Sequence, residues 1–140
     1  MHPYPETIGY NLVKLCKQYF NYLNVVLGEF GLYEGQHNML MPLWHEDGLA
    51  QSELTRRLGI EPASVSKAVE RMEATGFVQR RPDPEDARAN RLYLTDQARA
   101  LEQPVKRALV DAEERLLANM SVEEKLLLRR LLLQMRDNLK

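Results

Sequence analysis

Two stretches with apolar residues at helical spacing lie in the middle of the chain, separated by a glycine. The first predicts a helix over residues 51–58 that ends at Gly59, because glycine adopts the left-handed conformation at low cost. The second predicts a helix that begins at Pro62, whose fixed φ suits a first helical position, and ends at Gly76. Two short helices joined by a tight turn indicate a helix-turn-helix.

The second predicted helix has one apolar and one polar face. Its apolar residues recur at spacings of three and four and predict a core-facing side made of Val65, Ala68, Val69 and Met72. Small and hydroxyl side chains near a helix start allow close approach to base edges in the major groove, while Lys and Arg reach phosphates or guanine acceptors. The candidate DNA-binding residues of this helix are Pro62, Ala63, Ser64, Ser66, Lys67 and Arg71.

The next segment predicts a hairpin. Phe77 and Val78 lead into three polar residues, and Leu92 and Leu94 alternate with Tyr93, which suggests two strands. The polar, proline-containing connection from Pro82 to Asn90 is not expected to extend the sheet. Arg88 at the tip is the candidate for insertion into a minor groove. Asp86 repels phosphate, so we expect it to accept hydrogen bonds from an arginine or a loop amide and hold the tip in place. The flanking candidates for phosphate contact are Arg80, Arg81 and Arg91.

These residues carry a family resemblance. GFVQRRPDPEDARANRLYLT resembles the wing signature of the MarR family of bacterial transcriptional regulators, with its Asp-x-Arg element at Asp86 and Arg88 and its Leu-Thr at Leu94 and Thr95. SELTRRLGIEPASVSKAVERMEATG resembles the helix-turn-helix of the same family. The resemblance implies a mainly α fold with a small β-hairpin wing. Residues 1–140 would form a single domain, with a winged helix-turn-helix lobe over residues 35–100 and dimerisation helices over residues 1–34 and 101–140.

The outer segments predict amphipathic helices. One apolar stripe predicts a long helix that ends near Gly31, and Ser121-Val122-Glu123-Glu124 is a capping box that opens the last helix. Leucines at 126–128 and 131–133 wrap more than one side of that helix. They are either ordinary core or a contact with a partner, and a homodimer is the simplest partner. Its two-fold symmetry would match a palindromic operator in double-stranded DNA, an arrangement that the resemblance also implies.

Two prolines interrupt predicted helices. Pro104 should kink one long helix over residues 95–119, either as a hinge or as static curvature. Pro42 should open or bend the helix before the helix-turn-helix, beside apolar residues. The resemblance implies that a small aromatic or phenolic effector binds between the dimer helices and the DNA-binding lobes. Tyr10, Tyr19, His37 and Trp44 are either core residues or lining residues of such a pocket.

Charge and composition limit the classes of protein. The net charge is −1; residues 51–95 hold eight Lys/Arg against seven Asp/Glu, whereas residues 1–50 hold two against five. DNA binding must therefore depend on arginines displayed on one face. No apolar stretch is long enough to cross a bilayer and the first residues do not resemble a secretion signal, so we expect a cytoplasmic protein without a membrane partner.

Catalytic and metal-binding motifs are not found in the sequence. It has no glycine-rich phosphate loop, nucleophile elbow or histidine-rich metal motif, so neither an enzyme nor a cofactor is expected. His37 and His45 do not have the spacing of a zinc-ligand pair. Cys16 at the edge of the apolar stripe is interpreted as a buried, inert residue; the alternative is the oxidant-sensing thiol found in one branch of the family.

The start of the first helix of the helix-turn-helix departs from the family pattern. Ala50 stands where a capping Ser or Thr is expected, and Ser52 or Asp47 could compensate. Glu46 and Asp47, at the end of the preceding helix, are expected to be solvated.

The residues and the family resemblance together predict a sequence-specific DNA-binding transcriptional regulator that acts as a homodimeric repressor. That it responds to a ligand is implied by the resemblance alone. The alternative is a winged-helix protein-interaction module without specific DNA binding, because one fold supports several functions.

Overall fold

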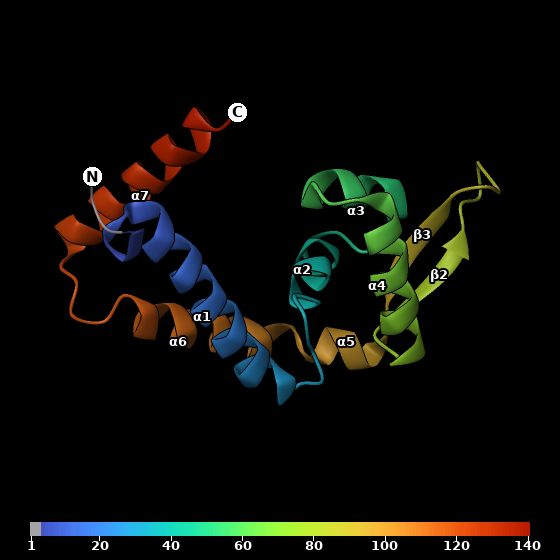
Figure 1. Cartoon of the computed structure of the whole chain (residues 1–140). Coiled ribbons are helices and arrows are strands. Elements are labelled where there is room, and N and C mark those ends of the chain that lie inside the picture. The colour runs from blue at the N-terminus through green and yellow to red at the C-terminus, as the bar shows by residue number, and fades with distance from the viewer. Residues whose placement is uncertain (1–3) are drawn as a thin grey trace. The chain divides into compact units, whose positions relative to one another are not determined.

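The fold is mainly helical with one small antiparallel sheet, in a computed structural model that describes residues 4–140 (Figure 1). The chain divides into two compact units, one up to Ala108 and the other from Leu109 onward. After a short 3₁₀ helix at Tyr4–Glu6, the elements are α1 (Ile8–Gly28), α2 (His37–His45), β1 (Leu49–Ala50), α3 (Gln51–Leu58), α4 (Pro62–Ala74), β2 (Val78–Pro82), β3 (Asn90–Leu94), α5 (Asp96–Ala100), α6 (Glu102–Leu116) and α7 (Val122–Asn138).

The helix-turn-helix forms where the sequence predicts it. α3 ends at Gly59, which has a φ of 65° in the left-handed region, and α4 begins at Pro62. The apolar side of α4 is packed into the core, since Val65, Val69 and Met72 are at most 1% exposed. The opposite side is therefore left for solvent or a partner.

The sheet is larger than the predicted hairpin. Its order is β1-β3-β2, and Pro82 pairs with Asn90, so the expectation that these two residues lie outside the sheet is wrong. Pro82 is tolerated because it ends an edge strand, where a missing N–H need not interrupt a ladder. β1 was not predicted: its two residues pair with Leu92 and Arg91 of β3.

α3 lacks a side-chain cap, as the sequence predicts, but the two acids before it differ from expectation. Ala50 caps α3 without a side-chain hydrogen bond. Asp47 does not compensate: its Oδ1 accepts from the Leu94 N–H at 2.9 Å and its Oδ2 pairs with Arg99 at 3.0 Å. Asp47 thus joins the end of α2 to β3 and α5. Glu46 is also not merely solvated, because it pairs with an arginine of α3 at 3.1 Å.

The predicted long helix after the wing is two helices. Leu101 separates α5 from α6, three residues before Pro104. Proline at 104 has no N–H for the carbonyl of Ala100, and its ring crowds that carbonyl, so the break comes before the proline rather than at it. Thr95 fixes the start of α5, since its hydroxyl accepts from the Ala98 N–H at 3.2 Å and donates to the Gly76 carbonyl at 2.6 Å.

α2 remains helical through Pro42, and its Met39, Leu40 and Leu43 are buried. The Trp44 indole N–H donates to the Ala98 carbonyl at 2.9 Å. Trp44 therefore ties α2 to α5.

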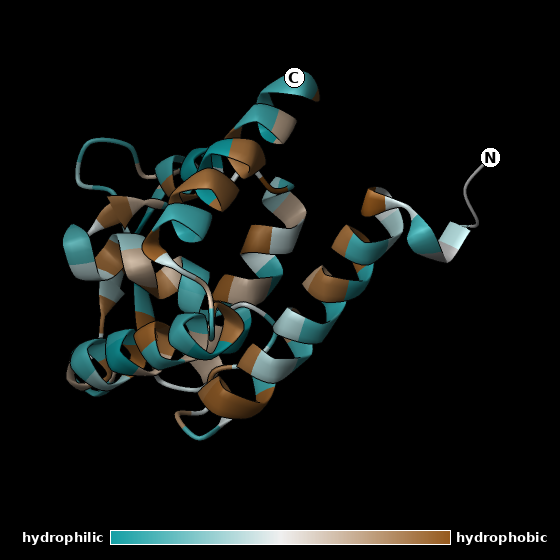
Figure 2. Cartoon of the chain, turned by 90° about the vertical axis from the view of Figure 1, so that its left-hand side faces the viewer, coloured by the Kyte–Doolittle hydropathy of each residue, from teal (hydrophilic) through white to brown (hydrophobic). Residues whose placement is uncertain are grey.

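α1 is largely unpartnered within its own unit. It ends at Gly28, three residues before the predicted end, and only Leu27 of its stripe is buried. Ile8 is 77% exposed, and Figure 2 shows hydrophobic bands recurring along this helix. Cys16 is exposed, which corrects the expectation of a buried residue.

α7 begins with the predicted capping box. The Ser121 hydroxyl accepts from the Glu124 N–H at 3.1 Å, and the Glu124 carboxylate accepts from the Ser121 N–H at 2.8 Å. No residue of α7 is buried, and Leu126 is 65% exposed. None of the helices in residues 4–140 is long and apolar enough to cross a membrane.

Candidate nucleic-acid interface

The outer face of α4 carries the predicted polar residues. Ser64, Lys67 and Arg71 are all exposed, as are Pro62 and Ala63 at the helix start. Within residues 4–140, Lys67 has no acidic partner, whereas Arg71 pairs with Glu34 at 3.2 Å. Lys67 is therefore the cation of this helix whose charge is fully available to an anionic partner.

Ser66 lies on the side of α4 that meets α3. Its hydroxyl accepts a hydrogen bond from the Gln51 Nε2 at 3.1 Å. The other end of the Gln51 amide, Oε1, is buried and has no hydrogen-bond partner among the described residues. An unpaired buried acceptor costs roughly 1 to 3 kcal/mol. Sequence reasoning missed Gln51, because its position opposite Ser66 depends on the packing of two helices.

The wing tip has the geometry that the sequence predicts. The Arg88 side chain is 95% exposed, and the Asp86 Oδ1 accepts from the Arg88 backbone N–H at 3.0 Å. The Arg88 Nε lies 3.7 Å from the same oxygen. Asp86 thus accepts a loop amide, as expected, and the guanidinium remains in solvent.

The three flanking arginines are engaged within the protein. Arg80 donates to Glu73 of α4 from its backbone N–H at 3.1 Å and from Nε at 3.2 Å. Arg81 lies over the ring of Tyr93, with its guanidinium carbon 4.7 Å from the ring centre. These contacts fix the side chains on the wing and, for Arg80, offset part of its charge.

The Arg91 side chain mainly makes hydrogen bonds within the protein. Its Nη1 donates to the Gly48 carbonyl at 2.8 Å and its Nε donates to Asp83 at 3.0 Å. The Glu85 N–H and, to a smaller extent, Arg91 hold the pKa of the Asp83 carboxyl below its ordinary value, although partial burial opposes them. Arg91 therefore links β3, the wing loop and the residue before β1.

α3 carries a second ionic cluster. Hydrogen bonds from Arg56 and Arg57 lower the pKa of Glu53 to about 2. Arg57 also pairs with Glu46 at 3.1 Å. The cluster ties the exposed side of α3 to the end of α2.

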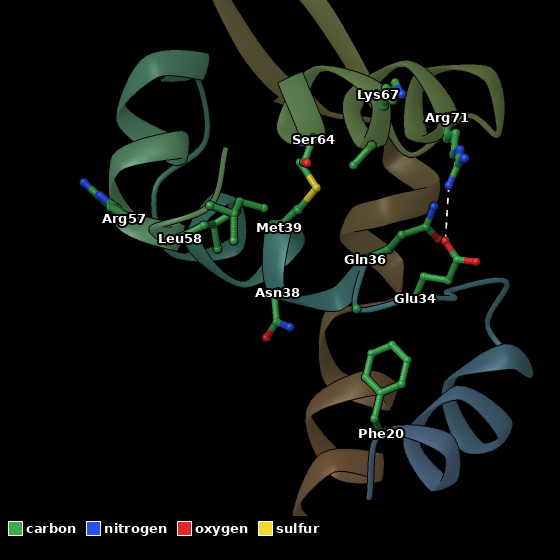
Figure 3. A pocket seen from close by; sticks show the side chains of 13 residues that line it. Phe20, Glu34, Gln36, Asn38, Met39, Arg57, Leu58, Ser64, Lys67 and Arg71 are labelled. Carbon is green, nitrogen blue, oxygen red and sulfur yellow. Dashed lines mark hydrogen bonds and ion pairs between the residues drawn. The ribbon is translucent and has the colours of Figure 1, made fainter. Parts of the chain in front are cut away.

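A cavity of about 640 Å³ lies beside the outer face of α4 (Figure 3). Apolar side chains of Phe20, Met39 and Leu58 line it together with the cations Lys67 and Arg71, and Figure 3 shows the ion pair between Arg71 and Glu34. The four candidates from the sequence do not line it: Tyr10, Tyr19, His37 and Trp44. Partial burial lowers the pKa of His37, which favours its neutral form.

The chain resembles known regulators in sequence. Residues 32–89 match the model of the MarR family. YdgJ of Bacillus subtilis (strain 168), an uncharacterized HTH-type transcriptional regulator, is 35% identical over 109 residues, which cover 78% of this chain but only 66% of that protein. YwoH of the same strain, also an uncharacterized HTH-type transcriptional regulator, is 33% identical over 102 residues, which cover 73% of this chain and 74% of that protein.

A solved structure agrees over a longer range. The transcriptional repressor CouR, bound to a 23-mer DNA duplex, superposes with a TM-score of 0.83 at 25% identity, covering 94% of this chain and 93% of that one. The sequence matches and the fold agree, and this chain belongs to the MarR family of transcriptional regulators.

Proposed function

We propose that this transcriptional regulator is a sequence-specific DNA-binding repressor that acts as a homodimer and responds to a small ligand. The observation that carries the proposal is the exposed Arg88 at a wing tip braced by Asp86, in the same lobe as the uncompensated Lys67 on α4. A polar helix face can contact base edges in a major groove, and an arginine at a fixed wing tip can enter the adjacent minor groove.

In this proposal α4 enters the major groove and the wing enters the neighbouring minor groove. Pro62, Ala63 and Ser64 allow close approach to base edges, and Lys67 contacts a phosphate or a guanine. Arg88 reads the shape and potential of the minor groove. The DNA phosphates are contacted by Arg71, Arg80 and Arg81, which keep their partners within the protein. Arg91 contributes mainly by holding the wing in its conformation. The similarity to CouR, a repressor bound to a 23-mer DNA duplex, supports DNA binding by a chain of this fold.

The exposed apolar residues of α1 and α7 support a homodimer. Both helices leave large apolar side chains in solvent, among them Ile8, Val25 and Leu126. Burying such residues against a second copy would remove apolar area from water. Residues 1–34 and 101–140 would then be the dimerisation helices and residues 35–100 the DNA-binding lobe. The α4 helices of the two protomers should enter successive major grooves about 34 to 36 Å apart.

The cavity beside α4 is the proposed effector site. Phe20, Met39 and Leu58 suit an aromatic ring, and Lys67 and Arg71 suit a phenolate or another small anion. Because Lys67 and Arg71 are also candidate DNA contacts, an anion in this cavity would compete with the phosphates for them. Release of DNA would follow from that competition.

The alternative is a protein-interaction module, which the exposed leucines of α7 also suit. Fluorescence-anisotropy titrations separate the two, using DNA from upstream of the protein's own gene and a scrambled duplex over a salt series. The proteins are the wild type, Arg88→Ala, and Arg107→Ala as a charge-matched control on the exposed surface of α6.

The repressor proposal expects selective, salt-sensitive binding of the upstream DNA. Arg88→Ala should weaken it and reduce the salt slope by about one, while Arg107→Ala should bind like the wild type. No binding of either duplex at low salt would contradict the proposal. The interaction module would gain support if, in addition, substitutions on α7 abolished binding of another protein.

A further inference from the structure

The loop between α1 and α2 contains a residue in an unfavourable backbone conformation. Glu34 has a φ of 53°, in the left-handed region, where a side chain with a Cβ is crowded and glycine is usual. Its backbone N–H donates to the Asn24 Oδ1 of α1 at 2.9 Å, and its carboxylate accepts from the Arg71 Nη1 of α4 at 3.2 Å (Figure 3). One loop residue thus contacts both α1, a proposed dimerisation helix, and α4, the proposed recognition helix.

The loop that carries Glu34 is fixed on both sides of this residue. The Tyr33 hydroxyl donates to the Gly28 carbonyl at the end of α1, at 3.2 Å. The Tyr33 N–H donates to the Gln36 Oε1, just before α2, at 3.0 Å. A residue in a left-handed conformation persists only where its surroundings hold it, and such residues are often functional. The position of the Glu34 carboxylate is therefore set by the end of α1 and the start of α2.

The Arg71 guanidinium can bind a second anion while it keeps Glu34. Arg71 lies one helical turn after Lys67 on the exposed face of α4. Among the described residues only its Nη1 is hydrogen-bonded, and the other nitrogens of the guanidinium also carry donors. A carboxylate on one edge of a guanidinium restricts the rotamers of this long side chain and leaves the other edge available to a phosphate oxygen.

We propose that Glu34 is a positioning residue that orients Arg71 toward a DNA phosphate, and that Asn24 of α1 holds Glu34 in place for this role. The inference rests on the proposed DNA-binding function and adds a determinant of affinity outside the lobe of residues 35–100. An arginine already held by Glu34 loses less side-chain entropy when it binds the phosphate. The charge of Glu34 repels the same phosphate, but both side chains are exposed, so solvent screens this repulsion.

Two substitutions that remove the same charge separate orientation from repulsion. Glu34→Gln keeps an acceptor for the Arg71 Nη1, whereas Glu34→Gly removes it and also suits the left-handed backbone. Thermal unfolding should therefore show no lower Tm for Glu34→Gly. Anisotropy titrations should show about threefold to fivefold weaker affinity for Glu34→Gly than for Glu34→Gln. The upstream and scrambled duplexes should be affected alike, because a phosphate contact carries no sequence information.

A substitution on α1 that changes no charge gives an independent check. Asn24→Ala removes the acceptor for the Glu34 N–H and should weaken affinity for both duplexes about twofold. Asn21→Ala, the same substitution at an exposed position three residues earlier on α1, should bind like the wild type. In an Arg71→Ala background Asn24→Ala should have no further effect, and Glu34→Gly should bind like Glu34→Gln, because both act through the guanidinium.

The possible outcomes distinguish this inference from the proposed function. Equal affinity of Glu34→Gly and Glu34→Gln, with DNA still bound selectively by the wild type, would overturn the inference and leave the proposed function standing. Differences that persisted in the Arg71→Ala background would also overturn it, because Glu34 would then act through the fold and not through Arg71. No DNA binding by the wild type at low salt would overturn both proposals.

Discussion

Glu73 of α4 accepts two hydrogen bonds from Arg80 of β2, from the backbone N–H at 3.1 Å and from Nε at 3.2 Å. The first of these is the main cause that lowers the pKa of Glu73, so the carboxylate stays charged at neutral pH. The pair fixes the recognition helix against the first strand of the wing. Because the two parts are proposed to enter different grooves, their relative orientation determines whether both can bind at once.

Two substitutions at Glu73 separate orientation from charge. Glu73→Gln keeps an acceptor for the Arg80 N–H but removes one negative charge from the lobe, so DNA affinity should stay equal or rise by about twofold. Glu73→Ala removes the same charge together with the acceptor, and its affinity should fall by about fivefold because the wing is no longer held. Anisotropy titration at fixed salt measures both. A rise in DNA affinity for both variants would show that Glu73 affects DNA binding only through its charge and not by orienting the wing.

Arg91 and Arg88 should differ in what their removal changes. Arg91→Ala removes the hydrogen bond to the Gly48 carbonyl and the contact with Asp83, so thermal unfolding should begin about 2 to 4 °C lower. Arg88→Ala, at an exposed tip, should leave Tm unchanged. Differential scanning calorimetry of both variants checks this. Equal Tm values for the two variants would contradict a stabilising role of the Arg91 hydrogen bonds.

Local signals explain which parts of the fold could be predicted. Gly59 and Pro62 set the bounds of α3 and α4 because each imposes its own backbone conformation. β1 has only two residues, and its pairing with Leu92 of β3 spans a separation that no periodicity reveals. The absent side-chain cap at Ala50 could be predicted, by contrast, because alanine has no side-chain hydrogen-bond acceptor.

The same division applies to the candidate site. Exposure of Lys67 and Arg88 could be predicted, because one lies on a polar helix face and the other at a loop tip. The internal roles of Arg91 and Gln51 depend on side chains brought together by tertiary packing. A count of charges could not separate an arginine that holds a carbonyl from one that faces solvent.

The Glu53 cluster predicts a pH dependence of stability. Arg56 and Arg57 lower the pKa of Glu53 to about 2, below its ordinary value of 4.5. A depressed carboxyl pKa gives stability that is fully present above about pH 4.5 and is lost as pH falls toward 2. Urea unfolding from pH 7 to 2.5 should therefore show the wild type losing its advantage over Glu53→Gln across that window.

Glu70→Gln, at an exposed position on α4, is the matched control and should follow the wild type. A constant difference between wild type and Glu53→Gln down to pH 2.5 would show that the ion pairs of Glu53 do not contribute to stability. Because solvent screens exposed ion pairs, the expected difference between wild type and Glu53→Gln is small.

The exposed leucines of α7 predict an assembly that one substitution should disrupt. Leu131, Leu132 and Leu133 are each 39% exposed, and no residue of this helix is buried. A helix with apolar residues on more than one side requires a partner, and a second copy supplies one for both protomers by symmetry. Leu132→Glu places a charge in that contact, which is unfavourable unless the charge is paired.

Light scattering after size-exclusion chromatography measures the mass of the assembly in solution. The wild type should elute at twice the chain mass of 16.3 kDa, and Leu132→Glu should shift toward a single chain at micromolar concentration. Lys125→Glu, at an exposed polar position of the same helix, changes charge without touching the leucines and should stay dimeric. Loss of the dimer should also weaken operator binding, since each half-site would then be bound alone. A wild type that elutes as a monomer would contradict the dimer, and the leucines would then need a different partner.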